Sequence, residues 1–396
     1  MSAAAALSIR SPWDGIRDLL GGIAPGNDPI DLTIGEPKHA PPAFYLDRLT
    51  EAAAGFAQYP PIRGTQALRG AIGAWIARRY DVPIDADTSI LALNGSREGL
   101  YSAVVPAIER RADIANPVVL MPNPFYQVYA AAALTAGAEP KYLAATREHN
   151  FLPDLDALEA DTELLARTVA FYLCSPANPQ GTLADAEYLA RAVRLARAHN
   201  FMLFVDECYS EIYGDAPPPG GLEIAWREGR SLDNVVVFNS LSKRSNLPGL
   251  RSGFCAGDAT YIDAFARFRN VTCPQVPLPI QHASHALWED EEHVEENRAA
   301  YARKFDLCDR VLGTRYGYQR PGGAFFLWLD MAQFGGSEAA TVTLWKGCGV
   351  RVVPGAYLCH PVDGEVDPGT DFIRIALVHD KSVTEVALER LVSQLG

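Results

Sequence analysis

Short apolar runs alternate with stretches of helical spacing between about residues 90 and 257. The runs are hydrophobic almost throughout, as expected of strands that are covered on both faces of a sheet. Six runs are predicted as strands: residues 90–93, 118–121, 168–174, 201–205, 235–239 and 253–256. Strand–helix alternation of this length predicts an α/β fold with a mostly parallel, doubly wound sheet.

Helices are predicted between these runs. Apolar residues recur at helical intervals from residue 100 to residue 107, although Pro106 should kink or shorten that helix. A second helix is predicted over residues 182–199, beginning with the capping pattern Thr182-x-x-Asp185.

The pattern changes after about residue 280. A long charged helical stretch over residues 281–312 precedes an aromatic-rich run and two further apolar runs at 350–353 and 372–377. These elements predict a smaller α+β domain, which we expect the first forty or so residues to join. The predicted division is an N-terminal segment at 1–45, a large domain at 46–280 and a small domain at 281–396.

Composition and charge exclude several classes of function. The 396 residues carry a net charge of −13, which argues against nucleic acid or an anionic membrane as a partner. No apolar run approaches the roughly 20 residues of a membrane span, and residues 1–7 lack the basic start of a signal peptide. The seven cysteines show no CxxC or zinc-ligand spacing. We therefore expect reduced thiols, a cytoplasmic protein and no metal site.

One lysine has chemically distinctive neighbours. The chain has six lysines, but only Lys243 lies among hydroxyls with an arginine close behind, in residues 240–251. An amine that must attack a carbonyl needs neighbours that bind the anionic end of a cofactor, and Ser240 and Arg251 could provide them. The alternative is a serine-rich basic loop on the surface.

Polar residues follow three consecutive predicted strands. Asn178 follows the run 168–174, Asp206 and Tyr209 follow 201–205, and Lys243 follows 235–239. Ligands of open parallel sheets bind at the carboxyl ends of strands, so these side chains should converge. Each is ambiguous alone, since Asp after a strand is commonly a cap and Asn-Pro is a common turn.

A further turn follows the first of these runs. Gly95-Ser96-Arg97 follows residues 90–93 after Asn94 and opens a predicted helix. It could be a plain cap, or an anion site built on free backbone N–H groups.

Together these segments resemble the fold-type I, pyridoxal-phosphate-dependent class I/II aminotransferases over nearly the whole chain. The matching segments occur in family order: residues 34–37, 59–64, 94–97, 122–126, 178–179, 206–209, 240–243, 251 and 372–376. The resemblance implies a large domain with a seven-stranded sheet, a small domain built from both chain ends, and pyridoxal 5′-phosphate (PLP) as cofactor.

The resemblance also implies catalytic roles. Lys243 would bind the cofactor aldehyde covalently and carry the proton between Cα and C4′. Asp206 would keep the pyridine nitrogen protonated, which makes the ring an electron sink. Asn178 and Tyr209 would hydrogen-bond the ring's phenolate oxygen, and Tyr126 would stack on the ring.

The resemblance also implies separate sets of ligands for the cofactor phosphate and for the substrate carboxylate. The implied phosphate ligands are Gly95, Ser96, Arg97, Ser240, Ser242 and Arg251, with Tyr59 from the partner subunit of a homodimer. Arg374 would hold the substrate α-carboxylate as a bidentate fork, assisted by Asn178 and the Gly35 backbone.

Three segments, residues 121–129, 174–182 and 240–251, are most similar to bacterial succinyldiaminopimelate aminotransferases of lysine biosynthesis. Those enzymes exchange an amino group between glutamate/2-oxoglutarate and N-succinyl-2-amino-6-oxopimelate by a ping-pong cycle. Both substrates carry a second carboxylate, for which Arg97 is the first candidate ligand and Arg244 and Arg63 are weaker ones.

Other readings remain open at this point. An aspartate, aromatic or acetylornithine-type aminotransferase would share every cofactor residue, and a carbon–sulfur β-lyase of the same fold would differ in reaction class. A PLP-sensing regulator would need a DNA-binding domain before the aminotransferase-like part, and only about 30 residues precede Ile34.

Overall fold

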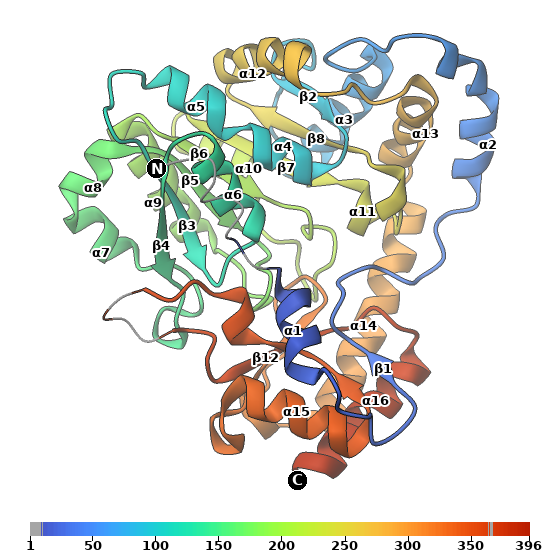
Figure 1. The fold of residues 1–396 in the computed structure, drawn as a ribbon. Coiled ribbons are helices and arrows are strands. Elements are labelled where there is room, and N and C mark those ends of the chain that lie inside the picture. Colours follow the sequence, from blue (N-terminus) through green and yellow to red (C-terminus); the bar gives the residue numbers. More distant parts are fainter. Residues whose placement is uncertain (1–8, 10, 363, 365–366) are drawn as a thin grey trace.

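A seven-stranded sheet forms the core of the larger lobe in this computed structural model, which describes residues 9, 11–362, 364 and 367–396 (Figure 1). The strand order is β2-β8-β7-β6-β5-β3-β4. The strands are β2 (Ile90–Leu93), β3 (Val118–Asn123), β4 (Glu139–Ala144), β5 (Thr168–Cys174), β6 (Met202–Asp206), β7 (Val235–Ser240) and β8 (Gly253–Gly257). Strand β8 is antiparallel to β2 and β7, and all other pairs are parallel. The predicted fold class is therefore confirmed.

Strand β4 is the one strand of this sheet that the apolar runs do not predict. It pairs only with β3, at the edge of the sheet, and all six of its residues are half-buried. Its sequence includes Glu139, Pro140 and Lys141. An edge strand with these residues has no apolar run to reveal it.

Helices cover both faces of the large sheet. Successive side chains of a strand point to opposite faces, and in β6 both sets are buried: Leu203 and Val205 on one face, Met202 and Phe204 on the other. The helices of this lobe are α2 (Phe44–Glu51), α3 (Gln66–Tyr80), α4 (Ser96–Ser102), α5 (Val104–Arg110), α6 (Gln127–Thr135), α7 (Leu155–Ala160), α8 (Thr162–Arg167), α9 (Ala186–His199), α10 (Gly221–Arg227), α11 (Leu241–Arg244), α12 (Ala259–Thr272) and α13 (Leu278–Glu289).

The smaller lobe combines the two ends of the chain. Its strands are β1 (Ile30–Asp31), β9 (Phe326–Asp330), β10 (Val350–Arg351), β11 (Val353–Pro354) and β12 (Phe372–Ala376), and its helices are α1 (Pro12–Leu20), α14 (Glu292–Leu312), α15 (Gly336–Cys348) and α16 (Lys381–Leu395). Strand β1 pairs with β10 in parallel, and α1 packs against α15. Strands β11, β12 and β9 form an antiparallel sheet. In Figure 1 this lobe lies below the large sheet, and α14 runs along one side.

The domain boundaries of the sequence analysis stay predictions. The one placed between residues 280 and 281 falls inside α13, which packs against α2 and α3 of the larger lobe.

The predicted start of helix α9 is wrong. The helix begins at Ala186, where the carboxylate of Asp185 accepts a hydrogen bond from the backbone N–H of Tyr188. The hydroxyl of Thr182 instead donates to the carbonyl of Asn150, 3.0 Å away. Asp185 alone is therefore the N-cap.

Two other predicted helices are interrupted. The stretch 281–312 consists of α13 and α14, which are separated at Asp290 and Glu291. Asp290 has an extended backbone, and its carboxylate accepts a hydrogen bond from the N–H of His293. Near Pro106 the chain forms two short helices, α4 and α5, that meet at Ala103.

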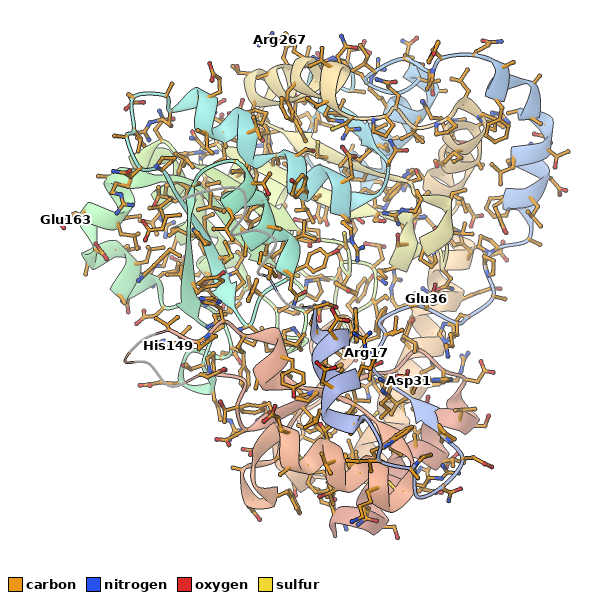
Figure 2. All side chains as sticks on the ribbon, in the orientation of Figure 1. Arg17, Asp31, Glu36, His149, Glu163 and Arg267 are labelled. Atoms are coloured by element: carbon orange, nitrogen blue, oxygen red, sulfur yellow. The ribbon has the colours of Figure 1, made fainter. Side chains whose placement is uncertain are left out.

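Charged side chains lie around the outside of both lobes. Glu163 and Arg267 project from the periphery of the larger lobe, while Glu36 lies close to the junction of the two lobes (Figure 2). Among the residues that the structure describes, no helix is both long and apolar enough to cross a membrane.

Candidate active site

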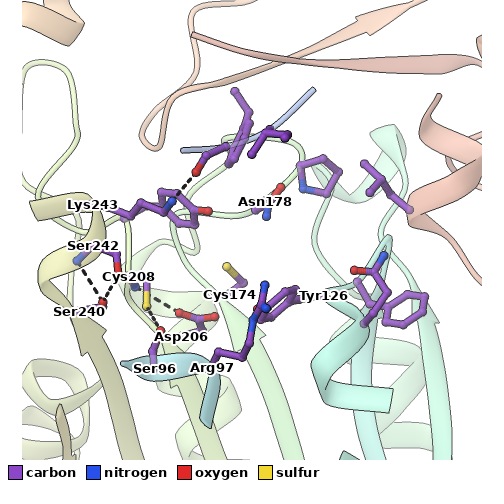
Figure 3. A pocket seen from close by; sticks show the side chains of 18 of the residues that line it. Ser96, Arg97, Tyr126, Cys174, Asn178, Asp206, Cys208, Ser240, Ser242 and Lys243 are labelled. Atoms are coloured by element: carbon purple, nitrogen blue, oxygen red, sulfur yellow. Dashed lines mark hydrogen bonds between the residues drawn. The ribbon is translucent and has the colours of Figure 1, made fainter. Parts of the chain in front are cut away.

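A cavity of about 590 Å³ lies between the carboxyl edge of the large sheet and the smaller lobe. All the predicted site residues line it except Gly95, Tyr59 and the weaker candidates Arg63 and Arg244. The lining residues among them are Gly35, Ser96, Arg97, Tyr126, Asn178, Asp206, Tyr209, Ser240, Ser242, Lys243, Arg251 and Arg374. Figure 3 shows that Lys243, Asp206, Asn178 and Tyr126 surround one space.

The sheet register explains this convergence. Asp206 is the last residue of β6 and pairs with Cys174 at the end of β5. Strand β8 runs antiparallel, so its start lies at the same edge, and Ser240 of β7 pairs with Gly253. Arg251 precedes β8 and therefore reaches the site from that side.

Lys243 lies on helix α11, directly after β7. The Ser240 hydroxyl accepts a hydrogen bond from the Ser242 N–H at 3.1 Å and so caps this helix. The Lys243 ammonium donates to the carbonyl of Gly35, across the junction of the lobes. Burial, together with the nearby cations Arg374 and Arg251, lowers the pKa of Lys243 from 10.5 to about 8. A substantial fraction of this amine is therefore neutral near physiological pH.

Asp206 is a buried carboxylate, 5% exposed, that has no cationic partner among the described residues. It accepts hydrogen bonds from the hydroxyl of Tyr129 at 2.7 Å and from the N–H of Cys208 at 3.2 Å. Burial raises the pKa of Asp206, while those hydrogen bonds and the charge of Lys243 lower it. A cation placed against Asp206 would favour its ionised form.

Arg374, on β12 of the smaller lobe, is a buried cation, 5% exposed. It donates to the Asn178 side-chain oxygen at 3.0 Å and to the Thr33 carbonyl at 2.5 Å. Its Nε has no hydrogen-bond partner within the described part of the chain, and burial lowers its pKa to about 10. A buried guanidinium with only neutral partners can accept a carboxylate.

The hydroxyls of Ser96, Ser240 and Ser242 and the guanidinium of Arg251 line the cavity, and we call this group the anion-binding corner. Within the described residues, the Arg251 guanidinium donates only to the carbonyls of Pro248 (2.9 Å) and Asn94 (3.3 Å). It lies so close to Gly95, at φ +79°, that a Cβ there would collide with it. Gly95 therefore allows the approach of Arg251 without lining the cavity itself.

The aromatic rings of Tyr126 and Tyr209 both line the cavity. The Tyr126 hydroxyl accepts a hydrogen bond from Arg97 Nε at 2.6 Å. The Tyr209 hydroxyl has no hydrogen-bond partner among the described residues, and its ring packs edge-on against Phe325 and Phe326. Both Tyr209 and the amide nitrogen of Asn178 are thus free to bind a ligand.

Comparison with known proteins identifies the family. Residues 27–391 match the family "aminotransferase class I and II". The chain belongs to the class I and II aminotransferases.

Similar aminotransferases include proteins with and without a stated substrate. The LL-diaminopimelate aminotransferase of Dehalococcoides mccartyi (strain ATCC BAA-2266) is 31% identical over 378 residues, covering 94% of this chain and 92% of that protein. An aminotransferase structure from Neisseria meningitidis Z2491 has a TM-score of 0.92 at 36% identity, with 98% of each chain covered. The aminotransferase AspB from Helicobacter pylori 26695 has a TM-score of 0.88 at 34% identity, covering 97% of this chain and 98% of that one.

Aminotransferases of this family depend on PLP, so the protein is a PLP-dependent enzyme. The residues present fit that cofactor. A buried carboxylate without a cation, at Asp206, suits a protonated pyridine nitrogen. The anion-binding corner of Ser96, Ser240, Ser242 and Arg251 suits a phosphate. Lys243 is a partly neutral amine in the same cavity.

Besides Gly95, three residues proposed from sequence lie outside the cavity. The ring of Tyr59 is 99% exposed on the larger lobe. Arg63 forms an ion pair with Asp263 at 2.6 Å. Arg244 is buried against the carbonyl of Leu287 at 2.6 Å and pairs with Glu291 at 2.9 Å. The predictions that Arg63 or Arg244 binds a distal carboxylate in this chain's cavity are therefore wrong, because each is committed to other partners.

The aminotransferase cavity also contains residues that the sequence analysis missed. Tyr129 lies in the first turn of α6, three residues after Tyr126, which is the N-cap of that helix, and the two rings pack edge to face with centroids 5.6 Å apart. Cys208 donates from its thiol to the Ser96 hydroxyl at 2.9 Å. Trp13, on α1, lies 5.9 Å from the Arg374 guanidinium, and no motif in the N-terminal segment points to it.

Proposed function

We propose that the protein transfers the amino group of glutamate to N-succinyl-2-amino-6-oxopimelate in a ping-pong cycle, as a succinyldiaminopimelate aminotransferase. One observation carries the proposed chemistry. The amine of Lys243, the unpaired carboxylate of Asp206 and the unpaired guanidinium of Arg374 share one cavity. When bound, PLP supplies the conjugated ring that accepts the electron pair left on the substrate α carbon.

Each side chain then has a distinct task. Lys243 Nζ would hold the cofactor and would move the proton between the substrate α carbon and C4′ of the cofactor. Asp206 holds the proton on the ring nitrogen, with Tyr129 and the Cys208 N–H fixing the carboxylate. Arg374 and Asn178 orient the α-carboxylate, which places the α hydrogen toward Lys243.

Several residues position the cofactor. Ser96, Ser240, Ser242 and Arg251 bind its phosphate. Tyr126, Tyr209 and Asn178 line the same cavity; Tyr126 would pack against the ring, and Tyr209 and Asn178 would donate hydrogen bonds to its phenolate oxygen.

The replacement Lys243→Ala tests the catalytic assignment. We expect it to abolish the visible absorption band of the bound cofactor and all transamination. The exposed Lys381→Ala is the matched control and should retain both. A variant of Lys243 that keeps the wild-type band would end the assignment.

A second carboxylate on the substrate requires a second cation. Arg97 lines the cavity, is exposed, and forms no ion pair with a described residue. We therefore expect Arg97→Ala to raise KM for glutamate about tenfold or more, and to raise KM for a neutral amino donor much less. Equal effects on both donors would reject this role.

LL-diaminopimelate is the second candidate substrate, because a 31% identical relative carries that name. A panel of amino donors separates the possibilities: succinyldiaminopimelate, LL-diaminopimelate, acetylornithine, aspartate and phenylalanine, each with 2-oxoglutarate. The highest kcat/KM identifies the substrate. A carbon–sulfur β-lyase would instead release pyruvate, ammonia and a thiol from a β-thioether amino acid such as cystathionine, without any keto-acid acceptor.

A homodimer in the cytoplasm is part of the proposal. Phe56 and Tyr59 are large apolar side chains exposed by 64% and 99% in the single chain, as expected of a surface that another subunit covers. Tyr59 would reach the partner's phosphate site. The seven cysteines are all free thiols, which supports a reducing compartment.

A further inference from the structure

A second cavity of about 300 Å³ adjoins the active-site cavity. Pro12, Phe125 and Gln127 line both, so these residues lie at the boundary between the two spaces. The remaining lining residues of this side cavity are Ile9, Ser11, Gly15, Leu134, Tyr142, Ala356, Tyr357, Cys359, His360 and Pro361.

The walls of the two cavities carry an unequal distribution of charge. Among the described lining residues, Asp206 is the only carboxylate, and it already accepts hydrogen bonds from Tyr129 and Cys208. The cations Arg97, Arg374 and others face the first cavity. Two further carboxylates lie behind the lining of the second cavity, where Glu338 accepts a hydrogen bond from Tyr357 and Asp367 interacts with Cys359. A second ammonium group on a substrate would therefore lose its hydration without meeting a carboxylate on the wall of the second cavity.

The side cavity has neutral polar groups instead. Gln127 is half-buried at the partition, and its amide makes no hydrogen bond within the described part of the chain. An amide side chain offers both a donor and an acceptor. Beyond it, the rings of Tyr142 and His360 stack with centroids 4.2 Å apart. The backbone of His360 is held by two hydrogen bonds to the Asn123 side chain, at 2.8 and 2.9 Å.

We propose that the side cavity is the distal subsite of the active site and receives the amide-bearing arm of an ω-N-acylated amino acid. Gln127 pairs with the amide of that arm, and the stacked rings of Tyr142 and His360 support its carbon chain. A terminal carboxylate on the acyl group would reach solvent beside the exposed His360. This inference rests on the proposed transamination, and it favours an acylated substrate over one with a free distal ammonium.

Two ligands with the same carbon chain test the subsite: Nε-acetyl-L-lysine, which ends in an amide, and L-lysine, which ends in an ammonium. Each is titrated into the holoenzyme while the absorption band of the bound cofactor is followed, which does not require turnover. We expect half-saturation by Nε-acetyl-L-lysine at a concentration about tenfold lower than by L-lysine. Equal half-saturation, or a preference for L-lysine, would overturn the proposal.

Two variants locate the effect. Gln127→Glu places a carboxylate at the partition and should reverse the preference toward L-lysine, because an ammonium then has a counter-ion. Ala356→Leu fills the side cavity and should weaken Nε-acetyl-L-lysine about tenfold relative to glutamate. Val386→Ala, on the exposed face of α16, is the control and should keep the wild-type ratio. An unchanged ratio in Ala356→Leu would show that the arm lies elsewhere.

The proposed transamination can fail separately from the subsite. If it fails, glutamate and 2-oxoglutarate do not exchange amino groups in the wild type or any variant. If only the subsite is wrong, that exchange persists while the enzyme fails to distinguish the two lysine derivatives.

Discussion

Asp206 is held by a chain of buried aromatic groups. Tyr129 donates to its carboxylate, and the Tyr129 ring stacks on Tyr172 with centroids 4.4 Å apart and planes inclined by 7°. Tyr172 in turn donates to the carbonyl of Leu100. The carboxylate therefore has little freedom to turn away from the cavity.

Replacement of Asp206 should have a large effect on rate. Removing one partner of a buried, hydrogen-bonded charge pair costs about 3–5 kcal/mol, so we expect Asp206→Ala to lower kcat by about two to four orders of magnitude. Tyr129→Phe removes only the supporting hydrogen bond and should cost about tenfold. Steady-state kinetics of both variants checks this, and a Tyr129→Phe loss as large as that of Asp206→Ala would contradict the supporting role.

The lowered pKa of Lys243 predicts a pH dependence for cofactor capture. Only the neutral amine attacks an aldehyde, and this amine titrates near pH 8 rather than at 10.5. The rate at which apo-protein incorporates PLP should therefore rise about tenfold per pH unit below pH 8 and level off above it. Free Nα-acetyl-lysine is the control, and its rate should continue to climb beyond pH 9. A protein rate that climbs equally far would show that Lys243 is not perturbed.

The sequence could identify the cofactor and substrate site because each chemical task needs particular residue types, and these occur in short motifs. Asp206 ends β6 and Lys243 follows β7, so their convergence follows from the large sheet, whereas Arg374 reaches the same cavity from β12 of the smaller lobe. Arg244 was misassigned because sequence proximity to Lys243 does not fix direction: α11 points Lys243 into the cavity and Arg244 toward α13.

At the scale of single elements, helix α9 offers a direct test of its observed cap. Asp185→Ala removes the acceptor for the Tyr188 N–H and should lower the free energy of unfolding by about 1 kcal/mol. Thr182→Ala leaves this cap intact and should cost less. Urea denaturation of the two variants measures the difference. A larger loss for Thr182→Ala would favour the cap predicted from sequence.

The elements that the sequence predicted best are those buried on both faces. Strands β5, β6 and β7 are continuous apolar runs, because helices cover both sides of the sheet. Strand β4 lies at the edge, where no such requirement acts on its composition. The break between α13 and α14 lies at Asp290, whose carboxylate accepts a hydrogen bond from the His293 N–H. Asp290 belongs to an acidic run that is typical of an exposed helix face, so the sequence pattern did not indicate this contact.

At the scale of the whole molecule, the active site draws on two lobes and, in our proposal, on two subunits. Subunit mixing tests the second part. Lys243→Ala and Tyr59→Ala homodimers should each be nearly inactive. After dissociation and reassociation, half of the dimers are hybrids with one intact site of two, so about a quarter of wild-type activity should return. Activity that stays at the level of the separate variants would place Tyr59 outside the partner's site.

The pairing of β1 with β10 fixes an order of assembly during translation. All seven strands of the large sheet, with Asp206 and Lys243, leave the ribosome before Val350–Arg351 arrives to bind Ile30–Asp31, and Arg374 comes later still. Because domains of a growing chain fold as units, the pocket for the vitamin-derived group can form on the nascent polypeptide. The cation proposed to bind the substrate carboxylate, Arg374, joins the site last, when synthesis is nearly finished.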